Sequence, residues 1–197
     1  MVRRRRRARA RLLAAAFTVV AVACTGDDTE PVASTTSSPV EPAAAAKAVC
    51  GALRTWDNHV TEIANAAAHE TTEATSDAAR AAALLAGFDR LLETPDEFAA
   101  AVAELRLPEG DPWSTIRSEL LAAPEAVRAE LVDERADLAA VGPISADDER
   151  GRVSQFFNAV EKSLSLVEPR THRSPDAELR AAFRDEPECR HVVQSGQ

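Results

Sequence analysis

Residues 49–67, VCGALRTWDNHVTEIANAA, decide the fold class of this 197-residue chain. Their apolar side chains recur at steps of four and three, at Val49, Leu53, Trp56, Val60, Ile63 and Ala67. This spacing places them on one stripe of an amphipathic helix. Alanine makes up about a fifth of the chain and Tyr is absent, a composition that favours helix over strand. We therefore predict an all-α protein.

Apolar stripes of the same kind continue almost to the C-terminus. They comprise Ala81, Leu85, Phe88 and Leu92; Phe98, Val102 and Leu105; Trp113, Ile116, Leu120, Val127, Leu131, Leu138 and Val141; Val153, Phe156, Val160, Leu164 and Val167; and Leu179 and Phe183. No segment alternates apolar and polar residues as a half-buried strand does. We therefore predict that residues 43–197 form a bundle of five to seven amphipathic helices with short loops.

Several residues indicate where these helices begin and end. Thr94-Pro95-Asp96-Glu97 has the form of a capping box with Pro at the first helical position. Ser145 and Ser174-Pro175-Asp176 are expected to begin the last two helices, and Gly142-Pro143 to end the one before them. Pro124 either kinks the helix that contains it or begins a new one.

The first 23 residues have the layout of a secretory signal peptide. Seven arginines, at positions 3–7, 9 and 11, precede an apolar run of twelve residues, Leu12–Ala23. This run is too short to span a bilayer, which takes about 20 residues, but it suits the apolar region of a signal peptide. We expect residues 1–23 to be removed.

The run ends in Ala21-Val22-Ala23-Cys24, which resembles the lipobox of bacterial lipoproteins. That family has small residues before an invariant Cys, usually with Leu where this chain has Ala21. The resemblance implies that Cys24 carries a diacylglyceryl group, becomes the mature N-terminus and holds the protein on the outer face of the cytoplasmic membrane. The same residues also fit an A-x-A site for ordinary signal peptidase, which would release a free secreted protein.

A tether is predicted to follow Cys24, so that residues 24–42 separate the lipid from an extracytoplasmic domain formed by residues 43–197. Thr25–Pro42, TGDDTEPVASTTSSPVEP, is rich in Thr, Ser, Pro and acidic residues. Such a segment cannot bury enough apolar surface to offset its ordering entropy, and we expect it to be disordered. Fully extended, it would reach about 55 Å.

Cys50 and Cys189 are the two cysteines that remain once Cys24 carries the lipid. An even number of cysteines outside the cytoplasm indicates a disulfide. We predict one bond that staples the two ends of the bundle together. Its loop of 139 residues would contribute about 5 kcal/mol at most to stability.

The charge balance argues against two classes of partner. The whole chain has a net charge of −9. Loss of the leader's seven arginines leaves 16 of the 23 basic residues against all 32 acids, a net charge of −16. Phosphate backbones and anionic lipid headgroups both attract Lys and Arg, so we expect neither nucleic-acid binding nor electrostatic membrane binding. Membrane attachment would depend on Cys24.

The Ala- and Arg-rich chain with only two Lys is typical of a high-GC genome, and we expect an actinobacterial origin.

No catalytic or metal-binding motif emerges from the sequence. The four histidines, His59, His69, His172 and His191, form no H-E-x-x-H motif, and Glu188-x-x-His191 occurs once where di-iron bundles use two such motifs. No serine stands in G-x-S-x-G or S-x-x-K. We therefore expect no enzyme, metal or cofactor.

Two further groups of residues have a structural interpretation. Trp56 and Trp113 lie on apolar stripes and are expected in the core. The acidic residues of one helix are expected to form an exposed face of ion pairs with Arg128 and Arg135; they are Glu125, Glu130, Asp133, Glu134 and Asp137.

Two functions fit these features. The first is a non-enzymatic module that recruits a protein or cell-wall partner at the membrane. The alternative is a lipoprotein that binds a small ligand in an apolar cavity between its helices.

Overall fold

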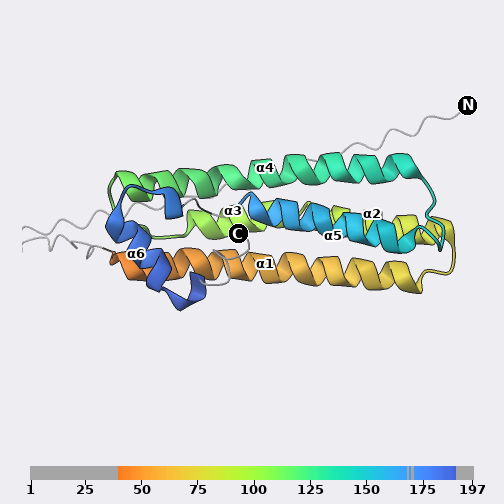
Figure 1. Ribbon diagram of the computed structural model, residues 1–197. Coiled ribbons are helices and arrows are strands. Elements are labelled where there is room, and N and C mark those ends of the chain that lie inside the picture. The colour runs from red at the N-terminus through yellow and green to blue at the C-terminus, as the bar shows by residue number, and fades with distance from the viewer. Residues whose placement is uncertain (1–39, 168, 170, 190–197) are drawn as a thin grey trace, which may run out of the picture. The chain divides into compact units, whose positions relative to one another are not determined.

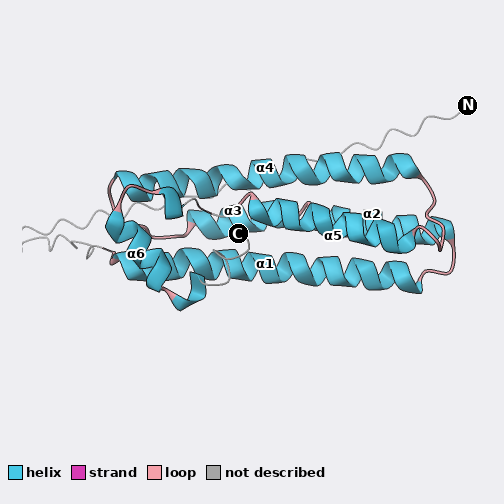
Figure 2. Ribbon diagram, viewed as in Figure 1, coloured by secondary structure: helices cyan, strands magenta, loops and turns pink. Residues whose placement is uncertain are grey.

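The computed structural model describes residues 40–167, 169 and 171–189, and these contain six α-helices and two short 3-10 helices. Figure 2 shows helices joined by loops throughout this part of the chain, with no strand. Contacts divide the chain into residues 1–37 and residues 38–197, and all of these helices belong to the second unit. The predicted all-α helical bundle is therefore confirmed.

Five helices run up and down along the bundle, and the remaining elements close one end of it. The five are α1 (Pro42–Glu73), α2 (Asp77–Leu91), α3 (Thr94–Ala103), α4 (Asp111–Val141) and α5 (Glu149–Ser165). Figure 1 shows the two long helices, α1 and α4, with α2, α3 and α5 between them, and α1 and α4 each contact all three. The chain then forms η1 (Thr171–Arg173), α6 (Ala177–Asp185) and η2 (Pro187–Cys189). Helices α6 and η2 pack against α1.

Most of the apolar stripes point into the bundle, as their spacing predicts, but on α2 the fully buried leucines are Leu84 and Leu91 in place of the predicted Leu85 and Leu92. On α1, Val49, Leu53, Trp56, Val60 and Ala67 are all buried. Three aromatic contacts join elements that are distant in sequence. They are Trp56–Phe98 between α1 and α3 (5.3 Å between ring centroids), Phe88–Phe156 between α2 and α5 (4.8 Å), and Trp113–Phe183 between α4 and α6 (5.8 Å).

Gly87 lets three helices approach one another closely. A Cβ atom at this position of α2 would lie 2.6 Å from the Cβ atom of Ala67 on α1 and 3.1 Å from the ring of Phe156 on α5. Any larger residue would push these helices apart, because close-packed interiors leave no spare volume. Ala67 and Gly87 together therefore set the spacing of α1, α2 and α5.

The disulfide between Cys50 and Cys189 is present, as predicted, with the two Cα atoms 5.1 Å apart. It joins η2, at the end of the described chain, to the first half of α1 across a separation of 139 residues. Arg54 and Glu188 form an ion pair across the same contact. The C-terminal elements are thus held covalently on α1.

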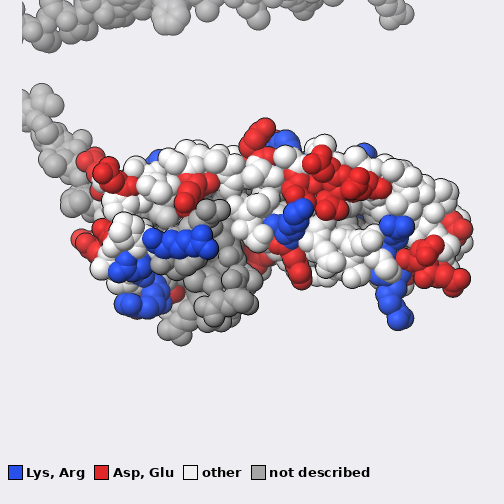
Figure 3. Space-filling model, turned by 45° about the horizontal axis from the view of Figure 1, so that its top comes forward, with Lys and Arg blue, Asp and Glu red and all other residues white. Residues whose placement is uncertain are grey.

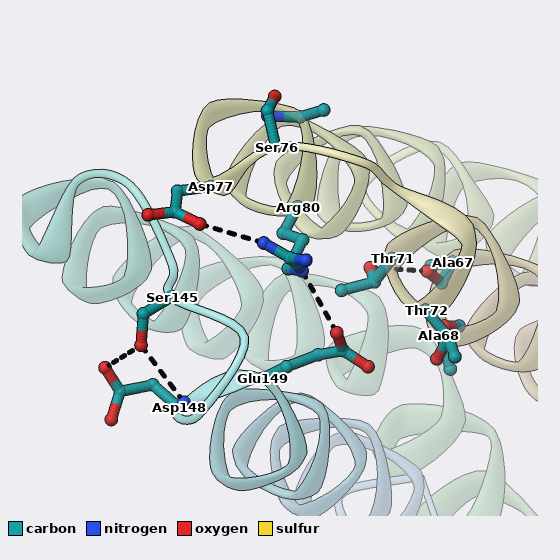
Figure 4. Close-up of polar contacts among 11 residues, drawn as sticks. Ala67, Ala68, Thr71, Thr72, Ser76, Asp77, Arg80, Ser145, Asp148 and Glu149 are labelled. Carbon is teal, nitrogen blue, oxygen red and sulfur yellow. Dashed lines mark hydrogen bonds and ion pairs between the residues drawn. The ribbon is translucent and has the colours of Figure 1, made fainter.

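Polar contacts hold the opposite end of the bundle, where the α1–α2 and α4–α5 turns meet (Figure 4). Arg80 of α2 pairs with Asp77 (2.9 Å) and with Glu149 at the start of α5 (3.0 Å). The backbone N–H of Ile144 donates to the carbonyl of Asp77 at 3.1 Å. These bonds fix the two turns to each other.

Two predicted helix starts are wrong in detail, and a third is confirmed. Thr94 does not cap α3, because its hydroxyl donates to the carbonyl of Leu91 at 2.9 Å, a competing local hydrogen bond. Ser145 accepts from the N–H of Asp148 (3.2 Å) within a turn, and α5 begins only at Glu149. The last helix begins where Ser174-Pro175-Asp176 predicts, because α6 is capped by Asp176, which accepts from the N–H of Leu179 at 2.7 Å.

Three further expectations need correction. α1 begins at Pro42, so the predicted tether would end one residue earlier. Pro124 does not begin a new helix, because α4 continues through it to Val141. Val141 itself is 40% exposed and does not belong to the core.

Candidate functional site

A groove of about 400 Å³ lies between α4 and α5, and most of its lining is polar. Helix α4 contributes Glu134, Asp137 and Leu138, α5 contributes Arg152, Gln155, Phe156, Asn158, Ala159 and Lys162, and α2 contributes Phe88. The Phe88–Phe156 pair, whose rings meet edge to face, lies at the bottom. The groove thus combines charged walls with an aromatic base.

The groove exists because a charged residue interrupts the inward stripe of α4. This stripe descends the helix at steps of three and four through Leu120, Ala123, Val127 and Leu131, all of which are buried. The next inward position is Glu134. Burial of a carboxylate there without a partner would be costly, which favours a solvent-open groove between α4 and α5 at this position.

The two walls of the groove carry opposite charges. Glu134 and Asp137 stand on α4, whereas Arg152 and Lys162 stand on α5. Figure 3 shows acidic side chains gathered where α4 comes forward, with basic side chains below them.

Within the described residues, neither cation forms a direct ion pair with the carboxylates of Glu134 and Asp137 opposite it. Arg152 donates to the side-chain oxygen of Gln155 at 2.8 Å, and Lys162 pairs with Glu130 at 2.5 Å. Within the described residues, neither Glu134 nor Asp137 has an ion pair or a side-chain hydrogen bond. The hydrogen bond to Glu130 raises the pKa of Lys162 above its ordinary value, and the charges of Glu134 and Asp133 add to the rise.

The arginines of α4 bind other helices instead of forming the expected ion-paired face on α4 itself. Arg128 pairs with Asp96 of α3 at 2.5 Å and donates to the carbonyl of Leu92 at the α2–α3 break. Arg135 pairs with Asp89 of α2 at 2.6 Å. The expectation of an intrahelical network is therefore wrong, because the nearest carboxylates lie on the neighbouring helices.

The described histidines pair with single carboxylates. His59 lies 3.0 Å from Glu97 of α3, and His69 lies 3.6 Å from Glu73 one turn further along α1. The side chain of His172 and all of His191 are outside the described residues. No three His, Cys, Asp or Glu side chains of the described part converge as metal ligands would.

The remaining predicted residues divide into two groups. Trp56 and Trp113 are buried in the core, as expected, at 5% and 6% exposure. The predicted signal peptide, Cys24 and residues 25–39 of the predicted tether lie outside the described residues. Within the described residues, no helix has both the length and the apolar character needed to cross a bilayer.

A second hollow, of about 350 Å³, lies where the start of α4 meets η1 and α6. It is lined by Asp111, Pro112, Thr115, Ile116, Glu119, Arg173, Ser174, Pro175 and Leu179. Its exposed wall is largely apolar, and its charged residues are Asp111, Glu119 and Arg173. The α4–α5 groove is therefore the stronger candidate for a functional site.

The sequence does not predict this groove. The exposed acidic face expected on α4 includes Glu134, although Glu134 is in register with Leu131 and Leu138. Four residues of α5 also recur at steps of three and four, beside its apolar stripe; they are Arg152, Gln155, Ala159 and Lys162. That spacing indicates that these residues share one face of α5. It does not indicate that this face lies opposite Glu134.

No protein-family model, curated protein or solved structure matches this chain. The function is accordingly argued from the residues themselves.

Proposed function

We propose that this chain is a bacterial lipoprotein, anchored through Cys24 on the outer face of the cytoplasmic membrane. Its helical bundle would be a non-enzymatic module that binds a protein or envelope partner. The observation that carries the proposal is Ala21-Val22-Ala23-Cys24, which ends an apolar run and precedes a Thr-, Ser- and Pro-rich segment.

The disulfide supports an extracytoplasmic location. Bonds such as Cys50–Cys189 persist in oxidising compartments and are rare in the cytosol, where thiols are kept reduced. A diacylated cysteine supplies two acyl chains, which is what stable membrane attachment requires. The tether would then let the bundle stand away from the bilayer.

The surface of the bundle supports binding over catalysis. Its polar residues are carboxylates, arginines and amides, exposed along the helices and paired mostly across helix contacts. The groove between α4 and α5 offers charges and amides that suit recognition of a polar partner. The alternative, an apolar cavity between helices, is supported by the smaller hollow beside η1 and α6, whose exposed wall is largely apolar, but not by the larger groove, whose lining is mostly polar.

Replacement of the lipobox cysteine tests the anchor. Cells that express the unmodified chain or Cys24→Ala would be fed a clickable fatty acid and separated into membrane and soluble fractions. We expect the unmodified protein to be labelled and membrane-bound, and Cys24→Ala to be unlabelled, either released or retained as the uncleaved precursor. Thr25→Ala, next to the lipidation site, serves as a control that should remain labelled.

Two results would contradict the anchor. One is a mature, membrane-bound Cys24→Ala protein. The other is an unlabelled, water-soluble native protein, the product expected from the A-x-A site at Ala21–Ala23.

Native mass spectrometry tests the interaction role. The protein would be purified from its own membranes in mild detergent. A retained protein or wall fragment supports the binding module, whereas a retained small apolar molecule supports the alternative.

A further inference from the structure

We propose that the α4–α5 groove binds a short peptide of about three residues with a free ammonium group and a free carboxylate. This proposal names the chemistry of the partner in the interaction role proposed above, and it rests on that role. The site is built from residues of α4 and α5 that hold the groove open.

The charges of the groove select a ligand that carries both signs. A simple anion would meet Glu134 and Asp137, and a simple cation would meet Arg152. Like charges placed opposite each other at short range are unfavourable, particularly where solvent is partly excluded. A zwitterion can instead place its ammonium group at Glu134 and Asp137 and its carboxylate at Arg152. Within the described residues, Glu134 and Asp137 have no direct ion pair or hydrogen bond, although the charge of Lys162 also attracts Glu134, so an ammonium group there breaks no direct contact.

The spacing of these residues along the two helices is compatible with a short peptide. Helices α4 and α5 are antiparallel, and the Glu130–Lys162 pair fixes their register. Glu134 is then roughly level with Asn158, and Arg152 lies six residues, about 9 Å, further along α5. By the same register, Asp137 is level with Gln155, about 4.5 Å from Arg152 along the helix axis. An extended tripeptide spans about 10 Å, so it can lie along this stretch of the groove with its ammonium group near Glu134 and Asp137 and its carboxylate near Arg152.

The remaining lining suits the middle of such a peptide. Gln155 and Asn158 stand between the two charged positions, and their amides can both donate to and accept from peptide groups. Leu138 and Ala159, above the Phe88–Phe156 pair, offer an apolar surface for a side chain. A volume of about 400 Å³ lies within the usual range of small-ligand sites.

Titration calorimetry with Ala-Leu-Ala tests the site. The complete protein, purified in mild detergent, would be titrated with this tripeptide bearing free termini. We expect saturable binding with a Kd below about 1 mM. N-acetylation or C-terminal amidation, each of which removes one terminal charge, should weaken binding about fivefold, the equivalent of about 1 kcal/mol.

Charge-removing variants assign each end of the peptide. Asp137→Asn should weaken binding of the free tripeptide about fivefold but leave binding of its N-acetyl form unchanged. Arg152→Gln should weaken binding of the free tripeptide equally but leave binding of its C-amide form unchanged. Glu125→Gln removes a carboxylate of α4 outside the groove and should bind all three peptides like the unmodified protein. All three side chains are solvent-accessible, and circular dichroism would verify that each variant folds.

Absence of saturable binding to the unmodified protein would overturn the proposal. So would tripeptide binding that Asp137→Asn and Arg152→Gln leave unchanged. The titration does not depend on acylation of Cys24. A failure here therefore leaves the lipid anchor standing, and a failure of the anchor leaves the groove standing.

Discussion

The two parts of α4 on either side of Leu131 differ in how they pack. From Trp113 to Leu131, the inward face is buried at every third or fourth residue. From Val132 to Val141, no residue is fully buried; Val132 and Val141 are 48% and 40% exposed, and Leu138 is half-buried. The first part helps to build the core, whereas the second part forms a wall of the groove.

One residue accounts for much of this difference. The inward register continues without a break from Leu131 through position 134 to Leu138, but Glu134 brings a charge to it. The Arg135–Asp89 pair holds this part of α4 against α2 at the surface. A helix can therefore keep one backbone geometry and one register while its packing changes from a closed core to an open groove.

The largest effect is expected from loss of the disulfide, which staples the well-packed end. The double variant Cys50→Ala/Cys189→Ala should lower the free energy of unfolding by up to about 5 kcal/mol, because the 139-residue loop gains freedom in the unfolded chain. Urea unfolding measures this loss. Hydrogen exchange should rise most in α6 and the first half of α1. The difference in local stability between the two ends of the bundle would then become smaller. An unfolding midpoint that reduction of the native protein does not shift would contradict this prediction.

Truncation of one leucine on each side of Glu134 tests the comparison directly. Leu131→Ala removes a buried side chain and should destabilise the protein by about 2–5 kcal/mol. Leu138→Ala removes a half-buried side chain and should cost only about 1 kcal/mol. Both variants keep the helix propensity of α4, so chemical denaturation reports packing alone. Equal losses would mean that the two parts of α4 pack equally well.

The smallest effect is expected from an attempt to close the groove. Glu134→Leu restores the apolar register and should stabilise the protein by about 1 kcal/mol, because a leucine there can cover Leu138 and the base of the groove. Glu125→Leu makes the same change on the exposed face of α4 and should alter stability by no more than about 0.5 kcal/mol. If the two variants have equal stability, the charge of Glu134 does not keep the groove open.

Much of the core could be predicted from residue spacing, but its polar contacts could not. Trp56, Phe156 and Leu179 are buried where the helical period places them. By contrast, Arg128 and Arg135 bind Asp96 and Asp89, which are distant in sequence. Periodicity shows which face of a helix is buried, whereas an ion pair depends on which helix lies beside that face.

The same distinction applies to the whole chain. The helical class, most of the inward stripes and the pairing of Cys50 with Cys189 could be predicted from the residues alone, because they follow from local periodicity and from a count of cysteines. The contact of Gly87 with Ala67 and Phe156, and the position of Glu134 and Asp137 opposite Arg152 across a groove, come from the packing of the helices. Such contacts depend on the distance and register between helices. Both are set by the packing of all the side chains together, which no single segment encodes.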